Sequence, residues 1–211
     1  MNELWIYDVI GEDMLGDGVS AKTVRDTLKM LDDDQELLVR VNSPGGNVFD
    51  GVAIKTLLDN WPKTVTVQID GIAASAASFI AMAGDEVRMA QGSMLMIHDP
   101  WSVVVGNAAD MEKEAGVLRK VAGELAAAYA GKSGKDVDEI RQAMAEETWY
   151  TADEAMAFGL ADAVLEQRAK AWTVPAAMGY RKAPTEQAVA PRNRLSVMSR
   201  RLSLTRAQMR R

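Results

Sequence analysis

Short apolar runs rich in β-branched residues alternate along this chain with stretches whose apolar residues recur every three or four positions. The first pattern predicts strands at residues 4–7, 37–41, 64–69, 86–89 and 94–97. The second predicts helices at residues 20–31, 48–58, from 75 onward, 108–129 and 136–145. This order of strands and helices predicts an α/β fold with parallel strands joined by right-handed crossovers.

Capping residues mark several of the predicted helix ends. Ser20 is a suitable N-cap for the first helix, and Gly131 is placed at the end of the long helix. Thr151 and Glu154 fit a capping box for a further short helix, which Gly159 closes.

The C-terminal part of the chain differs from the rest in regularity and in charge. After residue 171 the periodic patterns fade and prolines become frequent. Residues 181–211 carry nine Lys or Arg and one Glu, a net charge of +8. Because the whole chain has a net charge of −6, residues 1–180 have a net charge of −14. We therefore predict a domain at residues 1–171 and a basic linker and tail at residues 172–211.

The tail permits several interpretations. It is a solvated extension, a helix docked on the acidic body, a scaffold-binding arm, or a segment removed by self-cleavage. Its charge alone permits nonspecific contact with nucleic acid, but no nucleic-acid recognition motif accompanies it, so no specific nucleic-acid partner is predicted.

Composition narrows the available chemistry. The 211 residues include no cysteine and one histidine, which excludes disulfides and thiolate catalysis and leaves few nitrogen or sulfur ligands for a metal. We predict no metal and no cofactor. No apolar run approaches the ~20 residues that span a bilayer, and the N-terminus lacks a signal-peptide pattern, so a cytoplasmic protein is expected.

Three segments carry candidate chemistry. The run Asn42-Ser-Pro-Gly-Gly46 follows a predicted strand, and its glycines leave backbone N–H groups free to face an oxyanion. Ser75 lies among small residues where a second strand gives way to a helix, and His98 ends a third strand. Hydroxyl nucleophiles need a base that titrates near neutrality, so a histidine-dependent serine hydrolase would have to use His98. Taken singly, each segment is more simply a turn, a packed helix or a core histidine.

Two assignments stay open on the residues alone. Ser78 is a rival nucleophile, although it would lie deeper in the helix than Ser75. The acidic group that would orient the imidazole is Asp99, Glu146 or Glu147, and spacing does not choose among them.

Four motifs occur in the order found in the Clp protease proteolytic subunit family. They are Asn42-Ser-Pro-Gly-Gly, Gly71-Ile-Ala-Ala-Ser-Ala-Ala-Ser-Phe, Met96-Ile-His-Asp-Pro and Thr151-Ala-Asp-Glu-Ala-Met-Ala-Phe-Gly-Leu-Ala-Asp. The chain resembles this family over residues 4–166. The sequences of these motifs resemble most the phage and prophage branch, the Clp-like head maturation proteases.

This resemblance implies a fold, a site and an activity. The fold is a Clp/crotonase-like spiral of repeated β-β-α units with a protruding handle helix. The nucleophile falls on Ser75, the base on His98, and the third catalytic position, usually aspartate, on Glu147. The oxyanion hole matches the N–H groups of Gly46 and Ala76. The implied activity is that of a serine endopeptidase that processes phage capsid or scaffold proteins.

The resemblance also implies partners. Subunits are expected to form a homo-oligomeric ring, heptameric or stacked in pairs. The handle matches the predicted long helix, on which one face is apolar: Met111, Ala115, Leu118, Ala122 and Leu125. That face is equally expected from packing within the chain. The first predicted strand begins within five residues of Met1, which makes an ATPase partner doubtful. The competing functions are a crotonase-like acyl-CoA enzyme and a noncatalytic assembly module with a decayed site.

Overall fold

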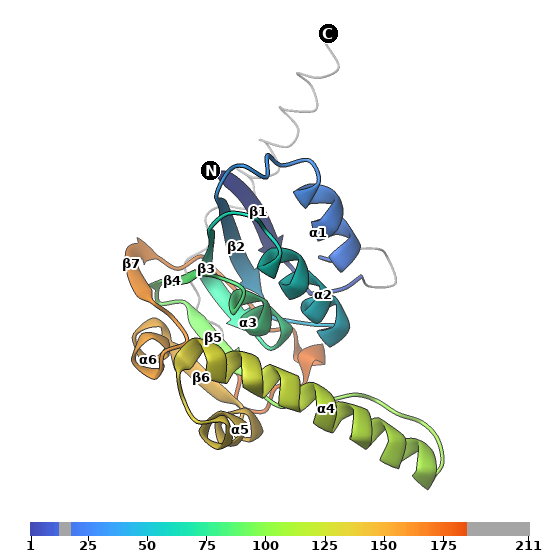
Figure 1. Cartoon of the computed structure of the whole chain (residues 1–211). Coiled ribbons are helices and arrows are strands. Elements are labelled where there is room, and N and C mark those ends of the chain that lie inside the picture. Colours follow the sequence, from blue (N-terminus) through green and yellow to red (C-terminus); the bar gives the residue numbers. More distant parts are fainter. Residues whose placement is uncertain (13–17, 185–211) are drawn as a thin grey trace, which may run out of the picture.

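The centre of the molecule is a mostly parallel sheet with helices packed against it (Figure 1). The computed structural model describes residues 1–12 and 18–184. The strands are β1 (Asn2–Tyr7), β2 (Leu37–Ser43), β3 (Val65–Ala74), β4 (Glu86–Gln91), β5 (Met94–Ile97), β6 (Thr148–Thr151) and β7 (Ala163–Arg168). The helices are α1 (Ala21–Leu28), α2 (Val48–Asp59), α3 (Ala76–Ala81), α4 (Ala108–Ser133), α5 (Val137–Ala145), α6 (Ala152–Phe158) and the 3₁₀ turn η1 (Ala176–Met178).

The long strand β3 organises the sheet. All ten of its residues are buried, and it runs parallel to β2 on one side. On its other side, Thr66–Ile69 pair with β4, whereas Ile72–Ala74 pair with β5. The sheet therefore branches at β3. One branch has the strand order β1-β2-β3-β4-β7 and is parallel throughout. In the other branch β5 pairs with β3 and, on its other side, with the antiparallel strand β6. The predicted parallel α/β arrangement is confirmed.

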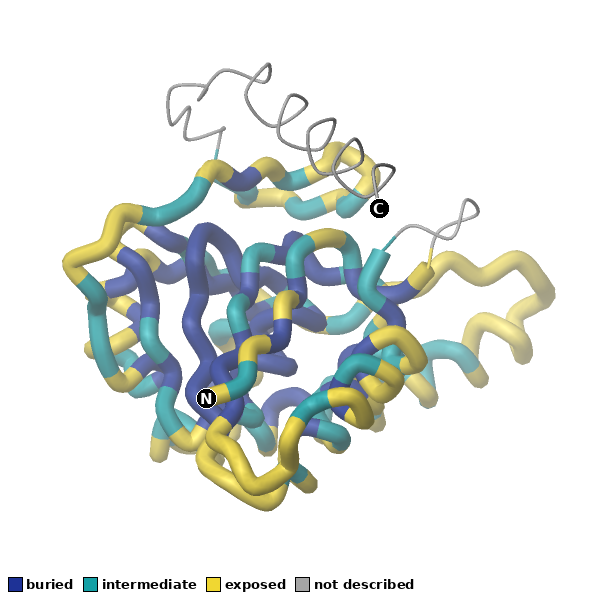
Figure 2. Tube along the Cα trace, turned by 90° about the horizontal axis from the view of Figure 1, so that it is seen from above, coloured by how far each residue is buried: buried dark blue, intermediate teal, exposed yellow. Residues whose placement is uncertain are grey.

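Apolar burial holds these layers together. Buried residues gather at the centre of the molecule and exposed segments surround them (Figure 2); β2 and β3 are mostly or fully buried, whereas β7 has no buried residue. The helices α2 and α3 approach closely because Gly51 has no side chain, and a Cβ there would lie 3.2 Å from the Cβ of Ala76. That approach fixes the start of α3 against its neighbour.

The long helix α4 has two different halves. Its last turns pack into the core through Leu125, Ala126 and Tyr129. Its first turns extend away from the body, where Met111 is exposed (Figure 1). The predicted protruding helix is thus present, but the predicted end at Gly131 is wrong. The helix continues to Ser133 because Gly134, with φ +69°, takes the C-cap position.

A buried carboxylate joins three strands. Asp70 on β3 is completely buried, and Arg40 on β2 donates to both of its oxygens, with N–O distances of 2.8 and 2.7 Å. Tyr7 on β1 and Gln68 also donate to this carboxylate. Burial by itself raises the pKa of the Asp70 carboxyl, but these hydrogen bonds outweigh burial and hold the pKa below its ordinary value. The charge is therefore fully paired inside the sheet.

The described part of the chain includes residues that the sequence placed in a linker. Trp172 is buried against the body, and residues beyond it also contact the sheet. Residues 185–211 lie outside the described residues, so the division at residue 172 stays a prediction, as does every interpretation of the basic tail. Among the described helices, none is both long and apolar enough to cross a membrane.

Candidate active site

The register of the sheet brings three distant segments to one edge. Ala74 at the end of β3 pairs with Met96 of β5, so the residues that follow these strands, Ser75 and His98, leave the sheet side by side. On β5's other side Ile97 pairs with Thr148 in antiparallel register, which places Glu147 next to His98. The carboxyl ends of parallel strands are where α/β folds usually place their sites.

Ser75 occupies a sharp turn between β3 and α3. Its backbone has φ 56° and ψ −122°, a conformation that L-residues rarely adopt. Two hydrogen bonds hold this turn, because the Ser75 N–H donates to the carbonyl of Met96 at 3.0 Å and the Phe79 N–H donates to the carbonyl of Ser75 at 3.1 Å. Such strain is retained only where the surroundings fix it, and here it turns the hydroxyl toward His98.

The hydroxyl and the imidazole are in contact. The Oγ of Ser75 lies 2.7 Å from the Nε2 of His98, a hydrogen-bond distance. Burial lowers the pKa of His98 below its ordinary value of 6.5, whereas the charge of Glu147 raises it and that of Arg181 lowers it. The ring is therefore neutral at pH 7, the form that can accept a proton from a hydroxyl.

The glycine loop lies against the same turn. Gly45 has φ +93°, and a Cβ on it would lie 2.8 Å from the Cβ of Ser75 and 2.5 Å from the carbonyl oxygen of Ala74. Only glycine permits this approach. The N–H groups of Gly46 and Ala76 take part in none of the backbone hydrogen bonds of the described turns and caps. Both residues line the same cavity as Ser75.

That cavity has a volume of about 400 Å³ and runs beside the Ser75–His98 pair. Residues 46–49, residues 100–102 and several residues of α4 line it. The exposed aromatic residues Phe49 and Trp101 are among these lining residues. The arrangement can hold an acyl compound with its carbonyl next to the hydroxyl.

Of the three acidic candidates, Glu147 is the buried one, whereas Asp99 and Glu146 are exposed. Within the described residues, its carboxylate accepts hydrogen bonds from the backbone N–H groups of Lys182 and Arg181, at 2.6 and 2.7 Å, and from the indole of Trp149 at 3.1 Å. None of these bonds comes from His98. Burial raises the pKa of the Glu147 carboxyl, but the three donors outweigh burial and keep the pKa below its ordinary value. The charge of Glu147 raises the pKa of His98, although no hydrogen bond joins the two side chains.

Ser78 stabilises the turn at Ser75 from the buried side. It is completely buried, and its hydroxyl lies 2.6 Å from the carbonyl oxygen of Met96, 2.7 Å from that of Ser75 and 2.9 Å from the hydroxyl of Tyr129. A hydroxyl enclosed in this way has no access to the cavity, so Ser78 is placed as a structural residue rather than as the rival nucleophile.

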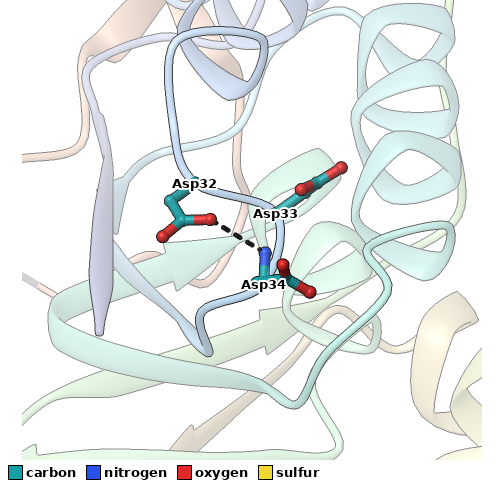
Figure 3. Close-up of side chains that lie close together, drawn as sticks. All are labelled: Asp32, Asp33 and Asp34. Carbon is teal, nitrogen blue, oxygen red and sulfur yellow. Dashed lines mark hydrogen bonds between the residues drawn. The ribbon is translucent and has the colours of Figure 1, made fainter.

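Acidic side chains gather at one other place in the described part of the chain. Asp32, Asp33 and Asp34 follow α1, and their oxygens lie within 4.8 Å of one another (Figure 3). All three are exposed, and Asp32 accepts a hydrogen bond from the backbone N–H of Asp34 at 3.1 Å. The cluster is accounted for as an Asx turn before β2.

Comparison with known proteins places the chain in a family. A model of the Clp protease family matches residues 9–168. The chain belongs to the Clp protease family. It is 33% identical over 159 residues to the ATP-dependent Clp protease proteolytic subunit 1 of Protochlamydia amoebophila, covering 72% of this chain and 77% of that one. It is 32% identical to the corresponding subunit of Porphyromonas gingivalis, covering 68% of this chain and 65% of that one.

A solved structure extends the similarity to the fold. A mutant of ClpP1 from Listeria monocytogenes aligns with a TM-score of 0.69 at 23% identity, covering 79% of this chain and 92% of that one. This likeness confirms the predicted Clp/crotonase-like fold.

The part of the site that sequence reasoning missed lies beyond the matched Clp region. Tyr180 lines the cavity with Ser75 and His98, although the sequence assigned it to a linker. The available signal was the pair of aromatic residues Trp172 and Tyr180 in a segment without a periodic pattern, since such residues usually find a surface to pack on.

Proposed function

We propose that this Clp-family protein is a serine endopeptidase with Ser75 as nucleophile and His98 as general base. The observation that carries the proposal is the 2.7 Å contact between the Ser75 hydroxyl and the His98 imidazole beside an open cavity. Gly46 and Ala76 line that cavity, and their N–H groups are assigned as the oxyanion hole. Glu147 is assigned as the acidic group that favours protonated His98 during the reaction.

The mechanism is acyl transfer. The Oγ of Ser75 attacks the carbonyl carbon of a peptide bond while the Nε2 of His98 takes its proton. The oxyanion that forms accepts hydrogen bonds from Gly46 and Ala76. His98 then gives the proton to the departing amine, the C–N bond breaks, and an acyl-enzyme on Ser75 remains. Water attacks this ester as His98 takes its proton. His98 then returns that proton to the Oγ of Ser75 as the ester C–O bond breaks, and the acid leaves. The sequence of steps needs no cofactor.

The cavity favours a peptide in extended form. Residues 46–49 and residues 100–102 line the cavity together with Ser75. An extended peptide between them would pair by main-chain hydrogen bonds as an added strand. The resemblance to the phage branch supports capsid or scaffold proteins as the natural substrates.

A homo-oligomeric ring is the proposed assembly. Large apolar residues are exposed before α4 and along its first turns: Trp101, Val103, Val104, Val105, Met111 and Val117. An apolar surface of this kind is typical of a subunit interface. The names of the two curated relatives, both Clp proteolytic subunits, support the same assignment.

Covalent labelling tests the assignment of Ser75. A fluorophosphonate probe is expected to label the wild-type protein on Ser75 and to leave Ser75→Ala and His98→Ala essentially unlabelled. Ser133→Ala, which changes a serine at the end of α4, is the matched control and is expected to label normally. Cleavage of phage capsid or scaffold proteins by the wild type but not by Ser75→Ala would support these proteins as the natural substrates. A folded oligomer that neither labels nor cleaves would point to a noncatalytic module or a crotonase-like enzyme.

A further inference from the structure

The segment after β7 crosses the edge of the sheet that carries the catalytic pair. The N–H of Lys170 donates to the carbonyl of Asp70 at 2.6 Å, and the side chain of Asn42 donates to the carbonyl of Ala171 at 3.3 Å. The Nζ of Lys170 also lies 2.8 Å from the hydroxyl of Tyr7. The segment is therefore attached to β1, β2 and β3 before it reaches the site.

Trp172 fixes the middle of this crossing. Its side chain is 5% exposed and packs with Ile72, Ala74 and Met96, the residues that precede the site on β3 and β5. Its indole stacks on that of Trp149, with ring centroids 6.5 Å apart and an angle of 17° between the planes. Burial of so large a side chain stabilises the docked position by about 2 kcal/mol or more.

Tyr180 then contacts both the base and the glycine loop. Its hydroxyl donates to the carbonyl of Pro44 at 2.6 Å, and its ring meets His98 edge-on, with centroids 5.2 Å apart. The hydroxyl also lies 3.1 Å from the point that a Cβ on Gly45 would occupy. Burial raises the pKa of Tyr180 to about 12, so the group is a neutral donor at pH 7.

Glu147 holds the end of the segment. Both of its oxygens accept backbone N–H groups there, those of Arg181 and Lys182. The residue that carries the family's third catalytic position is thereby joined to residues outside the matched Clp region, which ends at residue 168.

We propose that Tyr180 is a positioning residue for the Ser75–His98 pair, and that Glu147 keeps it in place by binding the backbone of residues 181–182. The inference rests on the proposed peptidase function and adds a part of the site that the Clp domain does not supply. Two observations indicate that the docked segment lines the site and does not block it. The Ser75–His98 hydrogen bond is formed with the segment docked, and the cavity of about 400 Å³ beside it remains open.

The proposal predicts a loss of rate without a loss of binding. Tyr180→Phe keeps the ring and removes the bond to Pro44, so the glycine loop and His98 lose their shared support. Since small misplacements at a reacting pair are costly, we expect kcat on a peptide substrate and the rate of fluorophosphonate labelling to fall about tenfold, with KM within about twofold. Tyr150→Phe makes the same chemical change on β6 and is expected to keep wild-type rates.

A second pair of variants tests the part of Glu147. Lys182→Pro removes the N–H that Glu147 accepts, whereas Lys182→Ala removes only the side chain. We expect slower labelling for the proline variant than for the alanine variant, while the thermal stability of the protein is unchanged. Tyr180→Phe and Lys182→Pro proteins that label as fast as their controls would overturn it, and so would a rise in rate, which would identify the segment as a lid. Failure of the wild type itself to label would instead overturn the proposed function.

Discussion

The hydroxyl of Ser78 lies 2.9 Å from the hydroxyl of Tyr129, so α3 and α4 are joined by a hydrogen bond in the core. The same serine lies 2.7 Å from the carbonyl oxygen of Ser75. The buried end of the handle helix is thus connected to the turn that holds the proposed nucleophile.

Ser78→Ala is expected to destabilise the protein, because it leaves the buried hydroxyl of Tyr129 without this partner. The cost to the free energy of unfolding should be about 1–3 kcal/mol, measured by urea denaturation. Tyr129→Phe and the double variant complete a cycle. The double variant should cost less than the two single changes added together, and strictly additive effects would contradict the coupling.

The pH dependence of labelling should respond to two charges in opposite directions. Labelling needs neutral His98, whose pKa is lowered by burial and by Arg181 and raised by Glu147. Glu147→Gln removes the raising effect, so the acid limb of the rate profile should move to lower pH. Arg181→Ala removes a lowering effect, so the limb should move to higher pH, by a smaller amount because the Arg181 side chain is largely exposed. Rates of fluorophosphonate labelling between about pH 4 and 8 measure both shifts. Shifts of the same sign would contradict the assignment.

Asp70→Asn should weaken the sheet. The change leaves the guanidinium of Arg40 without its buried counter-ion, at an expected cost of about 3–5 kcal/mol of unfolding free energy. The pKa of the Asp70 carboxyl is lowered in the folded state, so its contribution is present above the unfolded pKa and is lost as the pH falls through the folded value. Denaturation at a series of acidic pH values should therefore show a steeper loss of stability for the wild type than for the variant. Parallel curves would rule out this role for the carboxylate.

Two glycine-to-alanine changes should have opposite effects. Gly45→Ala forces an alanine to φ +93° and places a Cβ 2.5 Å from the carbonyl of Ala74, so it should cost at least about 1–3 kcal/mol and abolish labelling of Ser75. Gly116→Ala lies in α4 with no atom within 4 Å of the new Cβ, and it should stabilise the helix by about 0.5–1 kcal/mol. Thermal denaturation of both variants tests the pair. An active Gly45→Ala protein would contradict the close approach of the loop to the nucleophile.

Local signals in the sequence predicted much of the fold. Ser20 is the N-cap of α1, and Thr151 with Glu154 forms the capping box of α6, as expected from residues that hydrogen-bond their own backbone. The strands β6 and β7 were not predicted. β6 has four residues, and β7 lies at the edge of the sheet with its last residues exposed, so neither shows a clear apolar run. Such strands are specified by pairing with distant partners rather than by their own composition.

Site residues that lie in sequence motifs were predictable, whereas a site residue that is positioned by packing of distant segments was not. The single histidine of the chain pointed to His98, the family resemblance pointed to Ser75 rather than Ser78, and the sheet register places the two in contact. Their roles stay a prediction until labelling is measured. Tyr180 had no such motif. Its position depends on a chain crossing that is fixed by Trp172 and by the backbone bonds to Glu147, and these contacts join residues more than 20 positions apart.

The near-parallel indoles of Trp149 and Trp172 give the protein an optical reporter of its own. Near-UV circular dichroism responds to the fixed packing of aromatic rings, so this pair should contribute a signal that depends on residues 170–182 lying against the body. The attachment of that segment can then be followed during ligand entry or subunit assembly without any added dye.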